Sequence, residues 1–229
     1  MRKPSTGTPR DFYLSRKKKL LRNFDKTAKC IRGALEARFG DDADMLIKEI
    51  RREYEALIPD LPYIGGYKNL MYTLMIIASA RHLAVYRTMT KRGVAAEEFG
   101  SIVFEIEEEI IASLSAFTRL LLRIFFRLGF TGFGRRMLKK WAAESQRRRY
   151  PGDWVFAHVP GDGDAFDYGL DYTECVVCKF FRAHDAAEAA PYLCPADFAW
   201  TGSCAGDFSG PPPSPKASTA ATSGSRRGG

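Results

Sequence analysis

The residues best suited to chemistry lie close together, between Phe166 and Asp197. The stretch contains Asp171 and Glu174, which lie on either side of Tyr172, and one histidine, His184. It also contains three of the five cysteines, Cys175, Cys178 and Cys194. Thiolates act as nucleophiles and metal ligands, and carboxylates transfer protons. The remainder of the chain has the pattern of a helical scaffold, so we expect any chemistry to lie in this stretch.

The two carboxylates, Asp171 and Glu174, suit general acid–base catalysis, because paired carboxylates of unequal pKa can divide the two roles. They are separated by two residues, so within a strand their side chains point to opposite faces. At a strand-to-helix junction they can converge on one site. A structural role is the alternative, in which Glu174 caps the following helix and Asp171 pairs with an arginine.

Cys175 and Cys178 form a C-x-x-C motif, which admits several kinds of chemistry. A redox pair of the thioredoxin kind needs a βαβ context, which the sequence pattern does not supply. A zinc site needs two further ligands, which Cys194 and either His184 or Asp197 would provide. Alternatively, Cys175 is a nucleophile whose pKa is lowered at the N-terminus of a helix. The simplest interpretation makes two of the cysteines small buried hydrophobic residues. We therefore predict no cofactor, with zinc as the alternative.

Hydrophobic periodicity predicts a helical scaffold ahead of this stretch. Gly40 and Gly93 are expected to stop helices. The apolar residues around His82 indicate a central buried helix, in which this histidine is a core residue with a satisfied hydrogen bond. The expected helices cover residues 11–39, 42–57, 68–92 and 95–128, and a last basic helix ends near residue 150.

The pattern changes after residue 150. Residues 153–161 and 166–175 have the alternation of antiparallel strands. Residues 178–184 and 186–193 then look helical. The predicted fold class is α+β, with a mainly helical N-terminal two-thirds followed by a small C-terminal α+β unit with antiparallel strands.

Three segments follow from this organisation. Residues 1–150 form a helical domain, and residues 151–200 form the α+β unit that carries the cysteines. Residues 201–229 have no apolar periodicity, so they cannot bury enough apolar surface to offset the entropy of ordering. We predict that this tail is disordered.

The net charge of +8 is concentrated in one segment. Residues 119–149 contain ten Lys and Arg residues and one acid, Glu144. A basic patch suits nucleic acid, an anionic membrane surface or a small anionic substrate. Residues 135–149 match no nucleic-acid motif, so we predict a solvated helix face and no nucleic-acid partner.

Residues 110–130 are about long enough to span a bilayer, but Arg119, Arg123 and Arg127 make a span costly. We expect a soluble amphipathic helix, and a helix that lies on a membrane surface is the alternative. The basic N-terminus has no apolar run behind it, so we expect no secretory signal. With an odd number of cysteines, this indicates the reducing cytoplasm.

Several sequence blocks together resemble one known family. They are PYIGGYKNLMYTLMIIASARHLAVYRTMTKRGVAAEEFG, RRRYPGDWVF, DYGLDYTECVVCKFF and PYLCPADF. This set is similar to the L-2-amino-thiazoline-4-carboxylic acid hydrolase family, over residues 57–200. The D-Y-T-E-C-x-x-C-K run is its most specific part. The resemblance implies a bacterial cytoplasmic hydrolase that opens a 2-aminothiazoline ring with water to give N-carbamoyl-L-cysteine.

We therefore expect a small-molecule substrate to bind between the helical domain and the α+β unit. The expected catalytic residues are Asp171, Glu174 and Cys175. The expected substrate-binding residues are Tyr172, Cys178, Cys194 and Asp197. Two other function classes stay open. One is a non-enzymatic small-ligand module whose cysteines bind a metal or sense redox state, and the other is a membrane-surface helical protein.

The tail departs from the family pattern, which ends in a segment similar to RTTTLAEGGDRCDFRF. In this chain the tail contains Pro211-Pro212-Pro213 instead. The tail can be encoded by codons that give a different sequence when they are read in a frame starting at the third base of each codon. In that frame the three prolines become three threonines, and the next four residues become Leu-Ala-Glu-Gly. We predict that residues 201–229 are a frameshift product.

Overall fold

The computed structural model describes residues 9–129, 131–150, 152–161, 168–196 and 199–200. It has the predicted α+β layout, with helices through the N-terminal two-thirds and a two-stranded antiparallel sheet in the C-terminal part. The predictions for residues 201–229, and the predicted substrate-binding residue Asp197, lie outside the described residues.

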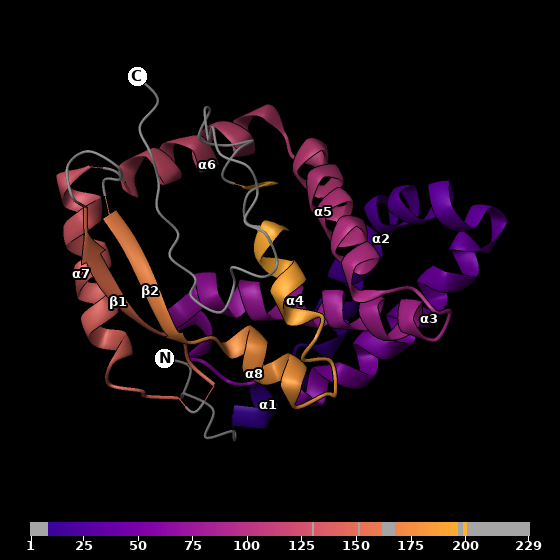
Figure 1. Ribbon diagram of the computed structural model, residues 1–229, viewed down its shortest axis with the longest axis horizontal. Helices are drawn as coiled ribbons and strands as arrows, with labels where there is room; N and C mark the ends of the chain where they lie inside the picture. Colours follow the sequence, from indigo (N-terminus) through magenta and orange to yellow (C-terminus); the bar gives the residue numbers. More distant parts are fainter. Residues whose placement is uncertain (1–8, 130, 151, 162–167, 197–198, 201–229) are drawn as a thin grey trace, which may run out of the picture.

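The N-terminal helices pack around α4, which lies near the centre of the molecule (Figure 1). Both α3 and α5 pack against α4, and α2 packs against α3 and α5. Gly40 ends α2 with φ at 53°, and Gly93 follows α4 with φ at 76°, so both predicted glycine stops are confirmed. The helices are α1 (Pro9–Leu14), α2 (Lys17–Phe39), α3 (Ala43–Leu57), α4 (Leu70–Thr90) and α5 (Ala96–Ser113).

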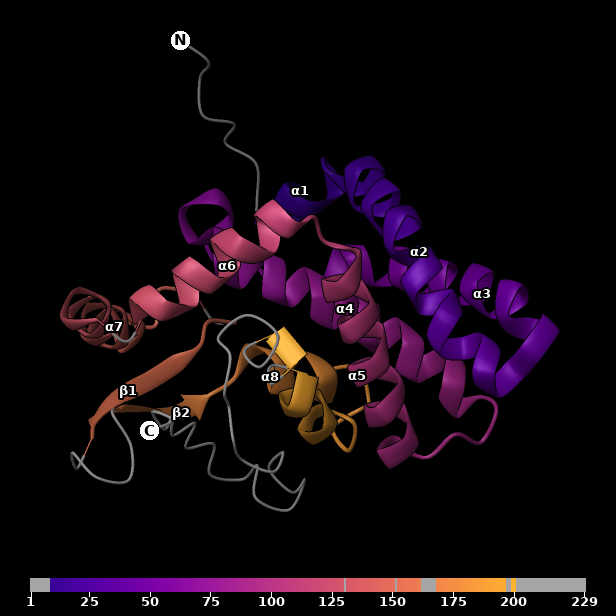
Figure 2. The same cartoon turned by 90° about the horizontal axis from the view of Figure 1, so that it is seen from above.

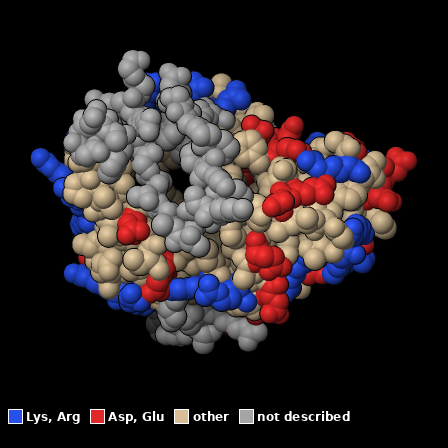
Figure 3. Space-filling model, in the orientation of Figure 1, with Lys and Arg blue, Asp and Glu red and all other residues tan. Residues whose placement is uncertain are grey.

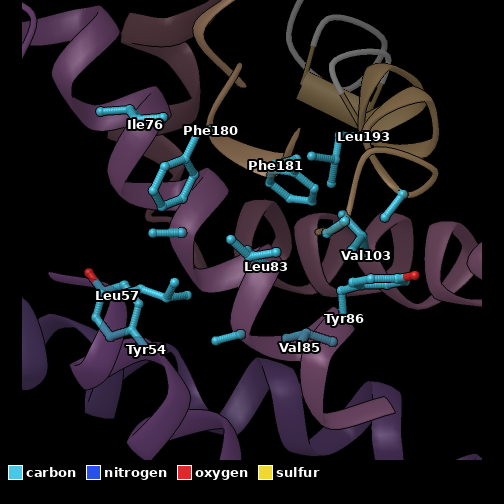
Figure 4. Close-up of a cluster of buried hydrophobic side chains, with 14 of the residues drawn as sticks. Tyr54, Leu57, Ile76, Leu83, Val85, Tyr86, Val103, Phe180, Phe181 and Leu193 are labelled. Carbon is cyan, nitrogen blue, oxygen red and sulfur yellow. The ribbon is translucent and has the colours of Figure 1, made fainter. Parts of the chain in front are cut away.

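One hydrophobic core joins the helical part to the C-terminal part (Figure 4). The short helix α8 (Val176–Arg182) places Phe180 and Phe181 against α4. Phe181 and Leu83 of α4 are both fully buried. The core is therefore continuous across residue 150, and it fixes the position of α8 relative to the helical scaffold. Its labelled members in Figure 4 are Tyr54, Leu57, Ile76, Leu83, Val85, Tyr86, Val103, Phe180, Phe181 and Leu193.

Two helices expected to be continuous are interrupted. The expected helix over residues 95–128 is divided into α5 and α6 (Ala116–Gly129), because Leu114 is extended at φ −69° and ψ 143°. Ser115 then starts the second helix, and its Oγ accepts a hydrogen bond from the backbone N–H of Thr118 at 3.1 Å. Likewise, the expected helix over residues 11–39 is divided between α1 and α2.

The sheet follows a basic helix, α7 (Gly132–Ser145), which ends before the expected residue 150 and packs against the first strand. Strand β1 (Val155–Pro160) pairs antiparallel with β2 (Tyr168–Glu174). The register passes from Val155↔Glu174 to Phe156↔Tyr172, so Thr173 is an extra residue in a β-bulge. Its hydroxyl donates to the carbonyl of Val155 at 3.2 Å. The sheet thus ends in a fixed geometry directly before Cys175.

Candidate functional site

Cys175 lies where β2 ends and α8 begins, as the sequence predicted. Its backbone is still extended, at φ −117° and ψ 122°, and its carbonyl accepts the first helical hydrogen bond, from the N–H of Lys179 at 3.0 Å. The side chain is half-buried against the core. It makes no short capping hydrogen bond to the helix. Weaker hydrogen bonds from N–H and S–H groups around the sulfur favour its ionised form.

The S–H of Cys178 donates to Cys175 and is the main cause that lowers the pKa of the Cys175 thiol to about 6. Burial opposes this change, whereas the backbone N–H groups of Cys178 and Val177 and the indole N–H of Trp154 favour the thiolate. The same hydrogen bond, together with burial and the charge of Cys175, raises the pKa of Cys178 above its ordinary range. The hydrogen bond between the two sulfurs therefore favours Cys175 as the thiolate and Cys178 as the thiol.

Trp154 and Asp153 join the site from the residues just before β1, and the sequence did not single out Asp153. Trp154 is buried and packs on Tyr72 of α4, with ring centroids 4.8 Å apart. The backbone N–H of Trp154 donates to the carboxylate of Asp153 at 3.0 Å. Burial raises the pKa of Asp153, and the charge of Lys179 acts in the opposite direction. Asp153 is thus a second ionisable group with a changed pKa. It adjoins Trp154, whose indole N–H donates to Cys175.

The two predicted catalytic carboxylates have different surroundings. Glu174 forms ion pairs with Lys179 and Arg148. The hydrogen bond from Lys179 is the main reason that the pKa of Glu174 is lowered. A lowered pKa makes a carboxylate a weaker base, so this environment favours an ion-pairing role. Asp171 is exposed on β2, opposite Ala157. Tyr172, predicted to bind substrate, packs on Phe156 with ring centroids 5.2 Å apart.

Cys194 lies directly after the 3₁₀ turn Ala190–Leu193, and its charge contributes to the raised pKa of Cys178. The C-terminal part thus brings all three predicted cysteines into one neighbourhood, and none of the three forms a disulfide in the described structure. His184, a proposed zinc ligand, directs Nδ1 toward Arg87 at 3.3 Å and lies edge-on against Phe180. Within the described ranges, no three His, Cys, Asp or Glu side chains are arranged to hold a metal ion.

A second polar cluster is buried between α4 and α5. Glu107 is 4% exposed, and its carboxylate accepts hydrogen bonds from Arg81 at 2.7 Å, His82 at 2.8 Å and Trp200 at 2.8 Å. Burial alone would raise the pKa of Glu107, but the hydrogen bond and charge of His82, then Arg81 and Trp200, lower it to about 2. Burial lowers the pKa of His82. The interpretation of His82 as a satisfied core residue is therefore confirmed, and the cluster links Trp200 to the helices.

Two hollows in the described part of the chain lie away from Cys175. A hollow of about 250 Å³ lies between α2 and α5, and one of about 520 Å³ lies between the end of α5 and α6. Comparison with known proteins gives no assignment: no protein-family model, curated protein or solved structure matches this chain.

Proposed function

We propose that the chain is a cysteine-dependent hydrolase of a small cyclic amidine, with 2-aminothiazoline-4-carboxylate as the substrate that the sequence resemblance suggests. The observation that carries the proposal is the position of the Cys175 thiol at the strand-to-helix junction, where the S–H of Cys178 and neighbouring N–H groups lower its pKa to about 6. A thiolate is the form of cysteine that attacks an electrophilic carbon. The proposal includes a cytoplasmic setting, in which such a thiol stays reduced.

The proposed reaction has two stages. The Cys175 sulfur attacks the amidine carbon, between the ring sulfur and the ring nitrogen, and the bond from this carbon to the ring sulfur breaks. The ring sulfur takes a proton and becomes the thiol of a cysteine derivative, which is held on Cys175 as an isothiourea. Water then attacks the same carbon, and the bond to Cys175 breaks. The products are the thiolate of Cys175 and N-carbamoyl-L-cysteine, so one water is consumed.

Two neighbours have roles in this scheme. Asp153 carries a proton to or from the reacting groups, because burial raises its pKa above the ordinary value of an aspartate. Lys179 and Arg148, held by their ion pairs with Glu174, attract the carboxylate of the substrate. We therefore assign Glu174 to positioning these cations. Asp171 keeps only its sequence-based assignment.

The experiment is ring opening of 2-aminothiazoline-4-carboxylate by purified protein, followed as release of free thiol. Cys175→Ala is expected to abolish the reaction, whereas Cys30→Ala is expected to leave it unchanged, because Cys30 is a half-buried thiol on α2. Mass spectrometry of the quenched reaction is expected to find the substrate added to Cys175. Turnover that persists in Cys175→Ala would refute the proposal.

A second candidate function rests on the contact between the two sulfurs. The S–H of Cys178 donates to Cys175, so the pair is placed to form a disulfide by exchange with a disulfide such as oxidised glutathione, which leaves as two thiols. A redox-sensing module would respond to this reagent with a loss of two hydrogens from the Cys175–Cys178 segment and would not open the aminothiazoline ring. Ring opening by the reduced protein decides for the hydrolase.

A further inference from the structure

Helix α6 presents an apolar face to the outside of the molecule. No side chain of α6 is fully buried. An amphipathic helix on a globular protein normally turns its apolar stripe toward the core. Here the opposite is seen, because the inner face carries half-buried Leu122 and Phe126 while the larger apolar set is exposed. The exposed set, with its exposed fractions, is Phe117 68%, Leu120 52%, Leu121 49%, Ile124 47%, Phe125 50% and Leu128 50%.

The exposed face continues around the corner into α7. Phe133 and Met137 are 67% and 37% exposed. The corner is tight: Thr131 caps α7 by accepting from the N–H of Gly134 at 3.1 Å, and a Cβ on Gly134 would come within 2.0 Å of the carbonyl oxygen of Leu128. Only glycine permits this approach. The tight corner therefore fixes α7 against the end of α6, and we call the exposed apolar side chains of both helices the α6–α7 surface.

The charge beside this surface is uniformly positive. Arg119, Arg123 and Arg127 recur every four residues and form a stripe along α6, bordering the apolar face on the side of Leu120. In Figure 3, Lys and Arg side chains line the edge formed by α6 and α7, whereas most Asp and Glu side chains lie toward α5, α2 and α3. Between residues 116 and 140 there is no Asp or Glu, and the cations are Arg119, Arg123, Arg127, Arg135, Arg136, Lys139 and Lys140.

We propose that the α6–α7 surface docks on an anionic lipid bilayer, with α6 lying in the plane of the headgroups. A helix with an exposed apolar face beside a row of arginines matches both parts of such a surface, because acyl chains accept the apolar side chains and lipid phosphates pair with the arginines. Figure 1 shows α6 along the upper edge of the molecule, and Figure 2 looks down on it from that side. No helix of the described residues is long and apolar enough to cross a membrane. The proposal is independent of the hydrolase reaction.

Two other occupants fit the same residues less well. A second copy that paired its own α6 with this one would bring two arginine stripes together without an acid between residues 116 and 140 of either copy. A nucleic acid would pair with the arginines but would leave Phe117, Ile124 and Leu128 in water. The lipid surface is the occupant that uses both the charge and the apolar side chains.

The test is co-sedimentation of the full chain with vesicles of mixed phosphatidylserine and phosphatidylcholine, compared with vesicles of phosphatidylcholine alone. Binding is expected to the mixed vesicles only and to weaken as salt is raised. The double variant Arg123→Gln/Arg127→Gln is expected to bind about 30-fold more weakly, from about fivefold per cation near an anionic surface. Its matched control is Arg22→Gln/Lys26→Gln, which removes the same charge from the exposed face of α2 and should bind as the wild-type protein does.

A third variant tests the apolar half of the surface. Leu121→Ser/Ile124→Ser keeps every charge and is expected to bind roughly tenfold more weakly or worse, because both side chains would otherwise enter the acyl region. Circular dichroism and the thermal midpoint establish that each variant is folded. Failure of the wild-type chain to bind mixed vesicles would overturn the proposal, as would equal weakening in the α2 control. Sedimentation velocity that shows a dimer lost in Leu121→Ser/Ile124→Ser would assign the surface to a second copy instead.

Discussion

Replacing Cys178 tests whether its S–H holds the proposed nucleophile as a thiolate. In the wild-type protein the pKa of Cys175 is lowered from its ordinary 9.0 to about 6, with the Cys178 hydrogen bond as the main cause. A hydrogen bond to a charged group contributes about 1.5–3 kcal/mol, which corresponds to a pKa change of about 1–2. Cys178→Ala is therefore expected to raise the pKa of Cys175 to about 7–8. At pH 6 the thiolate fraction falls from about one half to about 10% or less.

The assay is alkylation of Cys175 by iodoacetamide across the pH range, read by mass spectrometry of the peptide that contains it. Because only the thiolate reacts, the rate at pH 6 is expected to fall about fivefold or more in Cys178→Ala and to recover at pH 9. In the wild-type protein, Cys178 has a raised pKa and stays protonated, so alkylation of this peptide reports on Cys175.

Cys178→Ser is the matched control, because its hydroxyl restores a donor in nearly the same position. Its alkylation profile is expected to lie between those of the wild-type protein and Cys178→Ala. If Cys175 has the wild-type pKa in Cys178→Ala, the S–H of Cys178 is not the main cause of the lowered pKa. If both variants shift equally, lost packing and not the lost donor is responsible.

Three further predictions concern the scaffold, each read by urea unfolding. Glu107→Gln is expected to cost about 3 kcal/mol at pH 7, because the folded pKa of about 2 lies below the ordinary 4.5. The stabilisation by the ionised Glu107 carboxylate is present above pH 4.5 and is lost as the pH falls toward 2. The difference in the free energy of unfolding between the variant and the wild-type protein should therefore vanish over this range. A difference that stays constant would contradict the lowered pKa of Glu107. Glu105→Gln, on the same helix but partly exposed, is the control and should cost about 1 kcal/mol or less. Phe181→Ala, which empties a fully buried position between α8 and α4, is expected to cost about 3–5 kcal/mol, and a loss below about 1 kcal/mol would argue against one continuous core. Ser115→Ala removes the hydrogen bond that caps α6 and is expected to lower the free energy of unfolding by about 1 kcal/mol. No loss would indicate that α5 and α6 unfold independently of the core.

The helices could be predicted wherever a local signal marked their ends. Gly40 and Gly93 stop helices because a left-handed residue is needed there, and glycine is the residue that adopts it most easily. The break at Leu114 was missed because the apolar and charged pattern continues through it at helical spacing. The signal that could have found it is Ser115 with Thr118, a hydroxyl residue three positions ahead of the N–H that it caps.

The site was predictable only where its residues are neighbours in sequence. Cys175 and Cys178 share the first turn of a helix, so the motif already places the two sulfurs together. Trp154 comes from an earlier segment, and its indole N–H reaches the thiolate because the pairing of Val155 with Glu174 brings Trp154 toward Cys175. Asp153 accepts a hydrogen bond from the backbone N–H of Trp154. That register includes a bulge at Thr173, and alternation alone does not reveal a bulge. A tertiary pairing, and not a motif, therefore supplies the indole donor of the site.

Hydrophobic periodicity did not predict which face of α6 packs against the protein. An apolar stripe beside a row of arginines is the same pattern whether the stripe packs on a core or on lipid, because both environments exclude water. The sequence of α6 has apolar residues on more than one face, so it does not specify which face turns inward. The fold decides this by turning the narrower pair, Leu122 and Phe126, toward the protein and the wider set toward the outside. The arginines then lie beside the outward face, and charge and apolar area together select an anionic surface as the partner.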